Sequence, residues 1–301
     1  MDSITLRQLR YFEALAQHGH FGRAAEACAI SQPALSLQMK ALEDAVGSPL
    51  VEKGARQVRL TDLGEAFAVR ARDILRAVDE LGEFTQSRVG PFTGRFRLGT
   101  IPTIAPYLLP GVIKALSQRF AGLDVLPREA ITQKLIATLL DARLDAAIVA
   151  LPVSEPSLHE EHLFDEEFLL VRPSSDARKP VPEPANLREM RLLLLEEGHC
   201  FRDQALSYCR FTPSAPRSLM EGSSLSTLVQ MVAAGIGVTL IPEMAVGIET
   251  RSASVSVARL PSPRPTRKIG MVWRKTSPIA GHLLQVATLV RKAARERGRK
   301  T

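Results

Sequence analysis

Two of the three cysteines lie close together, in the segment GHCFRDQALSYC that runs from Gly198 to Cys209. An apolar run, Leu192–Leu195, then Glu-Glu-Gly and then this segment predict a strand, a turn and a helix. Cys200 would therefore lie near the start of the helix, where the positive end of the helix dipole stabilises a thiolate. The sequence indicates a reactive thiol at this position.

Polar neighbours support this interpretation. His199 and Arg202 are possible cations beside the thiol, and Asp203 can orient Arg202 or balance its charge. The alternative is that Cys200 is an inert buried thiol, which is the usual role of an isolated cysteine. The residues alone leave that alternative open.

The spacing of the two thiols indicates a switch instead of a fixed bridge. Nine helical positions separate Cys200 from Cys209, which is roughly 13 Å along the axis and on opposite faces. A disulfide needs Cα atoms within about 4.4 to 6.8 Å, so the helix would have to unwind. Peroxide would oxidise the Cys200 thiolate to a sulfenic acid, and Cys209 could then condense with it to a disulfide.

Length and composition set the context of this chemistry. A chain of 301 residues can bury the cores of two or more domains without disulfides. The start MDSITLRQLR lacks a secretory signal, and no run approaches about 18 apolar residues, so we expect a soluble cytoplasmic protein with no membrane partner. A disulfide in that reducing compartment would be transient. No metal-ligand cluster, phosphate-binding loop or nucleophile–base set appears elsewhere, and we expect neither metal nor cofactor.

The N-terminal region predicts a helix-turn-helix. Apolar residues recur at three- and four-residue steps in Leu6–Gly19, and an Ala-rich helix follows, in which Cys28 would be a small core residue. Ser31 can cap the next helix and Pro33 fits its first turn. The net charge of +7 suits a polyanionic partner.

The third helix has one apolar and one polar side. Its predicted core residues are Leu35, Met39, Leu42 and Val46. Gln32, Ser36 and Lys40 would be exposed on the other side. Gln can bond an adenine edge, Ser can reach a base or a phosphate, and Lys can hold a phosphate.

A basic hairpin completes the predicted DNA-binding domain. The stretch PLVEKGARQVRLT reads as two short strands around a turn, a wing in which Lys53 and Arg56 can reach the DNA backbone. The alternative is a plain three-helix domain with incidental charge.

The block FGRAAEACAISQPALSLQMKALEDAVGSPLVEKGARQVRLTDLGEAF resembles the DNA-binding domain of LysR-type transcriptional regulators. The shared features are the SQPALS core, the LE pair, the wing and the TxxG start of a linker helix. The resemblance implies that double-stranded promoter DNA is the partner. It places Gln32, Pro33 and Ser36 in the major groove. We expect Ser31, Lys40, Lys53 and Arg56 to bind DNA as well.

A long amphipathic helix should follow. Thr61 can cap it, and its apolar stripe comprises Leu63, Phe67, Ile74, Leu75, Val78 and Leu81. A helix of this length needs a partner, so we expect it to pair with its twin in a homodimer. The segment Ser87–Gly94 has the Gly and Pro of a hinge.

Alternating strand and helix patterns beyond the hinge predict an α/β effector domain. LysR-type regulators have a two-lobed effector domain that resembles periplasmic binding proteins, so the resemblance extends over nearly the whole chain. We expect a winged helix-turn-helix at 1–60, a linker helix and hinge at 61–90, and an effector domain at 91–301. Lobe I would comprise about 91–164 and 266–301, and lobe II about 165–265.

The thiol segment is similar to that of the peroxide-sensing members of the LysR-type family, which share a GHCxRDQ motif and a second cysteine at this interval. Ile101–Pro110 and Ser223–Pro242 support the similarity, whereas Phe201 and residues 212–220 depart from the pattern. The resemblance implies that Cys200 is the peroxidatic thiol and Cys209 the resolving one. Hydrogen peroxide would be held by Thr103, Thr132 and His199, in a pocket shaped by Arg202 and Asp203.

These inferences predict a redox-controlled transcriptional regulator, not an enzyme. We expect a homodimer or homotetramer whose effector domains repack when Cys200 is oxidised, RNA polymerase as a partner, and a glutaredoxin- or thioredoxin-type reductant. One alternative is a LysR-type regulator that binds a small metabolite between its lobes. Another is a thiol peroxidase that uses Cys200 catalytically. An unchanged peroxide response after replacement of Cys200 would favour the first, and turnover of peroxide over many cycles the second.

Overall fold

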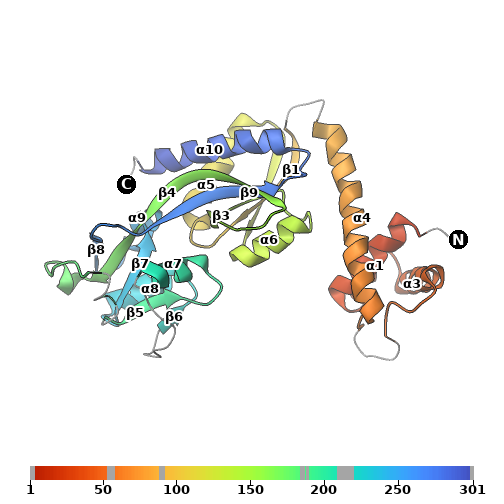
Figure 1. Ribbon diagram of the computed structural model, residues 1–301, viewed down its shortest axis with the longest axis horizontal. Helices are drawn as coiled ribbons and strands as arrows, with labels where there is room; N and C mark the ends of the chain where they lie inside the picture. Colours follow the sequence, from red (N-terminus) through yellow and green to blue (C-terminus); the bar gives the residue numbers. More distant parts are fainter. Residues whose placement is uncertain are drawn as a thin grey trace. The chain divides into compact units, whose positions relative to one another are not determined.

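The computed structural model describes residues 4–52, 58–87, 92–183, 187, 190–208 and 220–298. The chain forms two compact units, Met1–Arg88 and Val89–Thr301, which we describe separately (Figure 1). Several positions singled out from the sequence lie outside the described residues: Lys53, Arg56, Cys209, residues 88–91 of the predicted hinge and residues 212–219. Within the described part, no helix is both long and apolar enough to cross a membrane.

The N-terminal unit contains the predicted helix-turn-helix. Its helices are α1 (Leu6–His18), α2 (Phe21–Ala27), α3 (Gln32–Val46) and α4 (Asp62–Ser87). The Ser31 side chain accepts a hydrogen bond from the backbone N of Ala34 at 3.4 Å, which confirms the predicted cap of α3. An antiparallel bridge between Val51 and Leu60 forms the base of the wing. Cys28 follows α2 directly instead of lying within it, and burial raises the pKa of its thiol.

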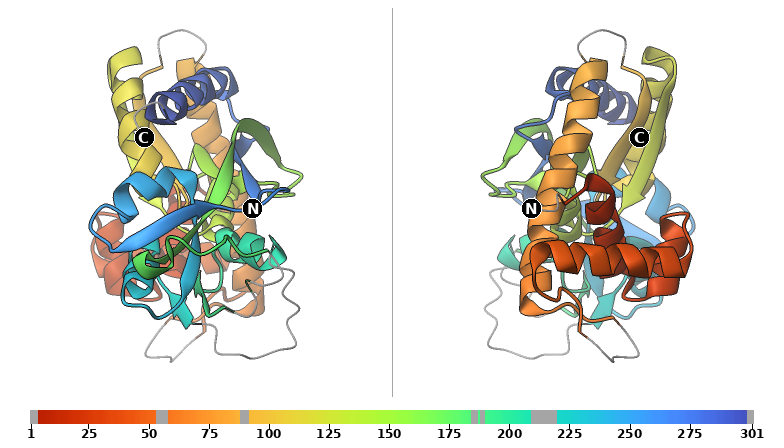
Figure 2. Two further views of the ribbon diagram at one scale, coloured as in Figure 1. Left: turned by 90° about the vertical axis from the view of Figure 1, so that its left-hand side faces the viewer. Right: turned by 90° about the vertical axis from the view of Figure 1, so that its right-hand side faces the viewer.

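Helix α4 has two apolar faces where the sequence predicted one stripe. Thr61 caps it, because its Oγ1 accepts from the backbone N of Gly64 at 3.0 Å. Ala71 and Leu75 are buried against Leu9 of α1, beside which α4 lies in Figure 2. Leu75 therefore belongs to the inner face. Leu63 and Ile74 are 44% and 48% exposed on the other face.

One half of the second unit is built on five strands. They are β1 (Gly94–Thr100), β2 (Leu123–Glu129), β3 (Ala146–Leu151), β4 (Leu158–Pro173) and β9 (Thr266–Arg274), in the order β2-β1-β3-β9-β4. The pairs of β1 with β2 and β3 are parallel, as expected for βαβ units. The chain returns antiparallel through β9. The associated helices are α5 (Ala105–Arg119), α6 (Thr132–Leu140) and α10 (Ala280–Gly298), and Figure 1 shows α10 and α6 on opposite sides of β4 and β9.

The other half continues from the far end of β4. This strand also pairs with β7 (Val238–Pro242) and β8 (Val255–Arg259), and β7 continues to β5 (Leu192–Leu195) and β6 (Met220–Gly222). Helices α7 (Cys200–Tyr208), α8 (Leu225–Ala233) and α9 (Glu243–Glu249) complete it. Each half has its own cluster of buried apolar side chains. The domain and lobe limits given above remain predictions.

Candidate functional site

A sharp turn positions Cys200. Strand β5 ends at Leu195 and α7 begins at Cys200, so few residues reverse the chain. Gly198 has φ +94, a left-handed conformation that side chains rarely adopt, and an added Cβ would lie 3.2 Å from Cδ1 of Ile131. Glycine is therefore required where the turn passes the start of α6.

Cys200 lies where the two halves of the effector unit meet. Its side chain is half-buried against the apolar cluster of the first half. The next residue, Phe201, is buried in the cluster of the second half, where its ring packs edge to face on Phe168 with centroids 4.7 Å apart. A change at Cys200 therefore affects both cores.

A small cavity opens beside the thiol. Its lining residues are Ile101, Pro102, Thr103, Ile131, Thr132, His199, Cys200 and Phe201. The centre of a water-sized molecule can occupy ≈ 10 Å³ of this space, which is about the room for a single such molecule. Drug-sized ligands need roughly 300 to 1,000 Å³. Only a ligand of very few atoms fits here.

Three helices begin at or close to the wall of this cavity. Thr132 and Cys200 are the first residues of α6 and α7, and Thr103 lies two positions before α5. Unsatisfied backbone N–H groups and the partial positive charge of each dipole favour an anion at such a place. The arrangement suits a reaction that releases hydroxide.

The two threonines of the cavity differ in their hydrogen bonding. The Thr132 hydroxyl is buried and has no hydrogen-bond partner among the described residues. The Thr103 hydroxyl accepts a hydrogen bond from Nη1 of Arg267 at 2.8 Å. Because that bond uses an acceptor site of the hydroxyl, its hydrogen can still be donated to a molecule in the cavity. A small guest could therefore bond to both threonines.

Arg267 and Glu166 contact residues of the cavity wall but do not line the cavity themselves. Neither residue was predicted from the sequence. They oppose each other across the antiparallel pair β4–β9 and form an ion pair of 2.7 Å, with side chains only 0% and 4% exposed. Arg267 also donates to the Thr103 carbonyl at 3.1 Å, and its guanidinium carbon lies 5.5 Å from the centre of the Phe201 ring. This buried pair fixes both Thr103 and the residue after Cys200.

His199 lines the cavity. Burial lowers the pKa of its imidazole, although the carboxylates of Glu196 and Glu129 act in the opposite direction. This shift favours the neutral ring at neutral pH, whereas the sequence suggested a possible cation at this position. A neutral imidazole offers one donor and one acceptor to a bound molecule.

The other predicted site residues are not part of the cavity wall. Asp203 is exposed, and Arg202 is half-buried on the first turn of α7. Tyr208, the last residue of α7 and the neighbour of Cys209 in sequence, is eight residues beyond Cys200, about 12 Å along the helix axis. The described structure therefore holds the start of α7 at the cavity and its end far from it.

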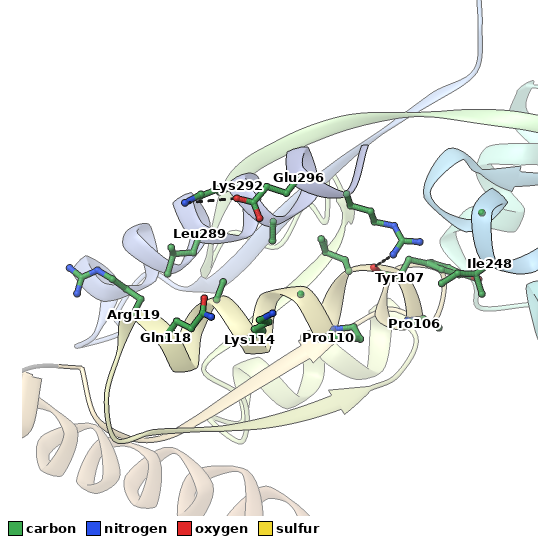
Figure 3. A pocket seen from close by; sticks show the side chains of 16 residues that line it. Pro106, Tyr107, Pro110, Lys114, Gln118, Arg119, Ile248, Leu289, Lys292 and Glu296 are labelled. Carbon is green, nitrogen blue, oxygen red and sulfur yellow. Dashed lines mark hydrogen bonds and ion pairs between the residues drawn. The ribbon is translucent and has the colours of Figure 1, made fainter. Parts of the chain in front are cut away.

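A larger hollow lies elsewhere on the effector unit. It is a groove of ≈ 1040 Å³ between α5 and α10 that is open to solvent (Figure 3). Lys114, Gln118 and Arg119 of α5 and Lys292 and Glu296 of α10 line it. Lys292 and Glu296 approach each other at 3.9 Å. The thiol takes no part in this groove, which is too polar and open to resemble an enclosed metabolite site.

The N-terminal unit presents the predicted DNA-binding residues on α3. Ser31, Gln32, Pro33, Ser36 and Lys40 are all exposed. On the opposite side of the helix Leu35, Met39 and Leu42 are buried, whereas Val46 is only half-buried. The exposed side can therefore approach DNA without disturbing the core.

Comparison with known families matches both units. The family of bacterial regulatory helix-turn-helix proteins of the lysR type matches residues 6–65, and the LysR substrate binding domain matches residues 90–295. A probable hydrogen peroxide-inducible genes activator of Streptomyces viridosporus is 43% identical over 297 residues, 97% of this chain and 95% of that protein. The DNA-binding transcriptional dual regulator OxyR of Escherichia coli is 40% identical over 292 residues, 96% and 95% of the two chains.

Solved structures agree with these relatives. A cysteine-to-aspartate variant of full-length OxyR from Pseudomonas aeruginosa has a TM-score of 0.78 at 35% identity, covering 97% of this chain and 96% of its own. A cysteine-to-serine variant of OxyR from Corynebacterium glutamicum with bound H2O2 has a TM-score of 0.67 at 35% identity, covering 97% and 93%. The chain belongs to the LysR family of DNA-binding transcriptional regulators, in the group of hydrogen peroxide-inducible genes activators that includes OxyR.

Proposed function

We propose that this regulator senses hydrogen peroxide through oxidation of Cys200 and a reversible disulfide between Cys200 and Cys209. One observation carries the proposal: Cys200 opens onto a cavity with room for about one water-sized molecule, in which the hydroxyl of Thr132 is buried and bonds to none of the described residues. A polar molecule of two oxygen atoms suits that space and can satisfy that hydroxyl. The names of the relatives support the same ligand.

The residues of the cavity supply the groups that the reaction needs. The Cys200 thiolate attacks one peroxide oxygen, the O–O bond breaks, and the second oxygen leaves as hydroxide, which a proton converts to water. Thr132 and Thr103 hold the peroxide by donating to it or accepting from it. The neutral ring of His199 can donate its N–H to the departing oxygen. Cys200 becomes a sulfenic acid.

The second step requires α7 to change. The Cys209 thiolate attacks the sulfur of the sulfenic acid, the S–S bond forms and the S–O bond breaks. The oxygen leaves as hydroxide, which a proton converts to a second water. Because α7 is helical from Cys200 to Tyr208, the two thiols can meet only after the helix unwinds. The disulfide therefore selects a local fold that differs from the reduced one.

Oxidation of Cys200 would change how the subunits assemble and how the protein binds DNA. We propose that the chain acts in the cytoplasm, where promoter DNA lies, as a homodimer or homotetramer that contacts RNA polymerase. Oxidation shifts the protein only if the two local folds make different contacts between subunits. A glutaredoxin- or thioredoxin-type reductant would reverse the signal by thiol–disulfide exchange.

Mass spectrometry after a near-stoichiometric pulse of hydrogen peroxide tests the chemistry. We expect a Cys200–Cys209 crosslink in the reduced wild-type protein, and a sulfenic acid held at Cys200 in Cys209→Ser. Cys28→Ser is the matched control and should behave as wild type. Thiols that stay reduced while methionines are oxidised would refute the proposal.

Two other functions have less support. A metabolite would need far more space than the cavity at Cys200 provides. A thiol peroxidase would not need the helix-turn-helix. Sustained consumption of peroxide over many cycles, with thioredoxin and its reductase present, would favour the peroxidase.

A further inference from the structure

The exposed side of α3 carries one large apolar side chain among its polar ones. Leu37 is 66% exposed, the highest value among the exposed large apolar side chains of the described residues. A leucine gains nothing from water, and the helix would be as stable with a polar residue there. It is therefore a candidate for a contact that forms only when α3 meets its partner.

Leu37 points almost directly away from the core. At about 100° per residue, its direction lies nearly opposite the mean direction of the buried residues of α3, which are Leu35, Met39 and Leu42. Pro33 lies one turn before it and Ala41 one turn after it, and both are exposed. The cap at Ser31 and the buried residues fix the orientation of the helix, so Leu37 is held at the centre of its outer surface.

The surroundings of Leu37 suit a polyanion. Residues 31–41 contain no acidic residue and include Lys40. The first acidic residue of α3, Glu43, is turned toward the wing, where its carboxylate accepts hydrogen bonds from the backbone N of Leu50 at 2.7 Å and of Val51 at 3.1 Å. An apolar side chain in a neutral to basic surface fits DNA better than it fits a second apolar protein surface.

We propose that Leu37 contacts the C5-methyl group of a thymine in the major groove and so selects a T·A pair at one position of each half-site. The thymine methyl is the apolar group that the major groove presents, and leucine has no group that can form a hydrogen bond with a base edge. The proposal rests on the DNA-binding role of α3. It makes Leu37 a specificity residue beside the hydrogen-bonding residues Gln32 and Ser36.

A double-mutant cycle between protein and DNA tests this contact. The probe is a duplex selected by the full-length reduced protein from a random-sequence library, in which each thymine is replaced in turn by uracil to remove the methyl group. Dissociation constants are measured by fluorescence anisotropy for wild type and Leu37→Ala. Burial of one methyl group predicts that, at one position of a half-site, uracil weakens binding of the wild-type protein about fourfold. Leu37→Ala should bind the thymine duplex about as weakly as wild type binds that uracil duplex. Replacing the same thymine by uracil should weaken binding of Leu37→Ala no further.

The controls separate the possible failures. Leu284→Ala removes a leucine that is 48% exposed on α10 and should match wild type on every duplex. Gln32→Ala reports whether α3 reads DNA at all. If Gln32→Ala weakens binding but no uracil position couples to Leu37, the thymine contact is wrong and the role of α3 stands. If neither variant changes binding, the role of α3 itself fails. A uniform loss in Leu37→Ala, with every uracil penalty retained, would assign Leu37 to a protein contact.

Discussion

The hydroxyl groups of two threonines in the same cavity have opposite effects on the stability of the fold. Thr103 accepts a hydrogen bond from a fully buried guanidinium, so its hydroxyl contributes to the stability of the effector unit. Thr132 has a buried hydroxyl without a partner among the described residues, so it reduces stability until a ligand arrives. A group that is unsatisfied in the resting protein is available to bind the signal.

This difference predicts opposite phenotypes for the same substitution. Thr132→Val should leave the free energy of unfolding unchanged or slightly higher, and slow sulfenic acid formation at Cys200 about tenfold through loss of one hydrogen bond. Thr103→Val should lower the free energy of unfolding by about 1 to 3 kcal/mol, because Arg267 loses an acceptor. Urea unfolding and stopped-flow oxidation of the two variants measure both effects. Equal destabilisation by both would contradict the assignment.

The lowered pKa of His199 predicts an acid-dependent loss of stability. In the unfolded chain His199 has its ordinary pKa of 6.5, whereas folding lowers the pKa of the ring. Below pH 6.5 the unfolded state therefore binds a proton more readily than the folded state. The contribution of His199 to the free energy of unfolding is complete above pH 6.5 and is lost as the pH falls toward the folded pKa. His199→Asn, which cannot titrate, should lose less Tm than wild type between about pH 7 and pH 5. An identical acid response in the two proteins would exclude His199 as the cause.

The sequence could identify only part of this site. Cys200 and His199 were found because they belong to one short segment, whereas Thr103, Thr132 and the peroxide-binding role of His199 followed from a family resemblance. Arg267 was missed because its partner Glu166 is about a hundred positions away, and the pairing exists only through the register of β4 and β9. A pattern of neighbouring residues cannot predict a contact between two strands that are far apart in the sequence.

At the scale of elements, the proposed mechanism makes α7 the link between oxidation and refolding. The helix runs from Cys200 to Tyr208, and under that proposal its unwinding would set the barrier to disulfide formation with Cys209. The step that senses peroxide and the step that locks the oxidised state should therefore respond to different substitutions.

Ser207, exposed near the end of α7, allows a test. Alanine favours helix over serine, and glycine disfavours it, a span of about 1 kcal/mol. We expect disulfide formation to be about fivefold slower in Ser207→Ala than in Ser207→Gly, with the same rate of sulfenic acid formation in both. Quenched-flow alkylation followed by mass spectrometry separates the two rates. Equal disulfide rates would show that α7 need not unwind.

Elements with local signals were predicted well. The caps at Ser31 and Thr61 and the strand Leu192–Leu195 are as expected, since capping and short apolar runs depend on neighbouring residues. The full length of β4 has no such local signal. The strand spans Leu158–Pro173, and its polar first part is held as a strand by long-range pairing with β9.

For the whole molecule, the outer face of α4 predicts how chains associate. Leu63 and Ile74 are exposed on the same side of the helix, with half-buried Phe67 between them. A second α4 would cover these side chains and pair two DNA-binding domains.

A charge on this face should prevent that pairing. We expect Ile74→Asp to be monomeric at micromolar concentration in analytical ultracentrifugation and to bind a two-half-site duplex at least tenfold more weakly. Val69 is 52% exposed but lies about 140° around the helix from Ile74. Val69→Asp should therefore remain oligomeric. Monomers from both variants, or from neither, would exclude this face as the interface.

Strand β4 belongs to both halves of the effector unit. One continuous backbone pairs with β9 over its first part and with β7 and β8 over its second. The pairs with β9 end at Glu167 and those with β7 begin at Phe168, so each half holds its own stretch of the strand. The strand is therefore a continuous covalent path from one half to the other. In the proposed mechanism, a local refolding of α7 in the second half would be transmitted along this path to the first half.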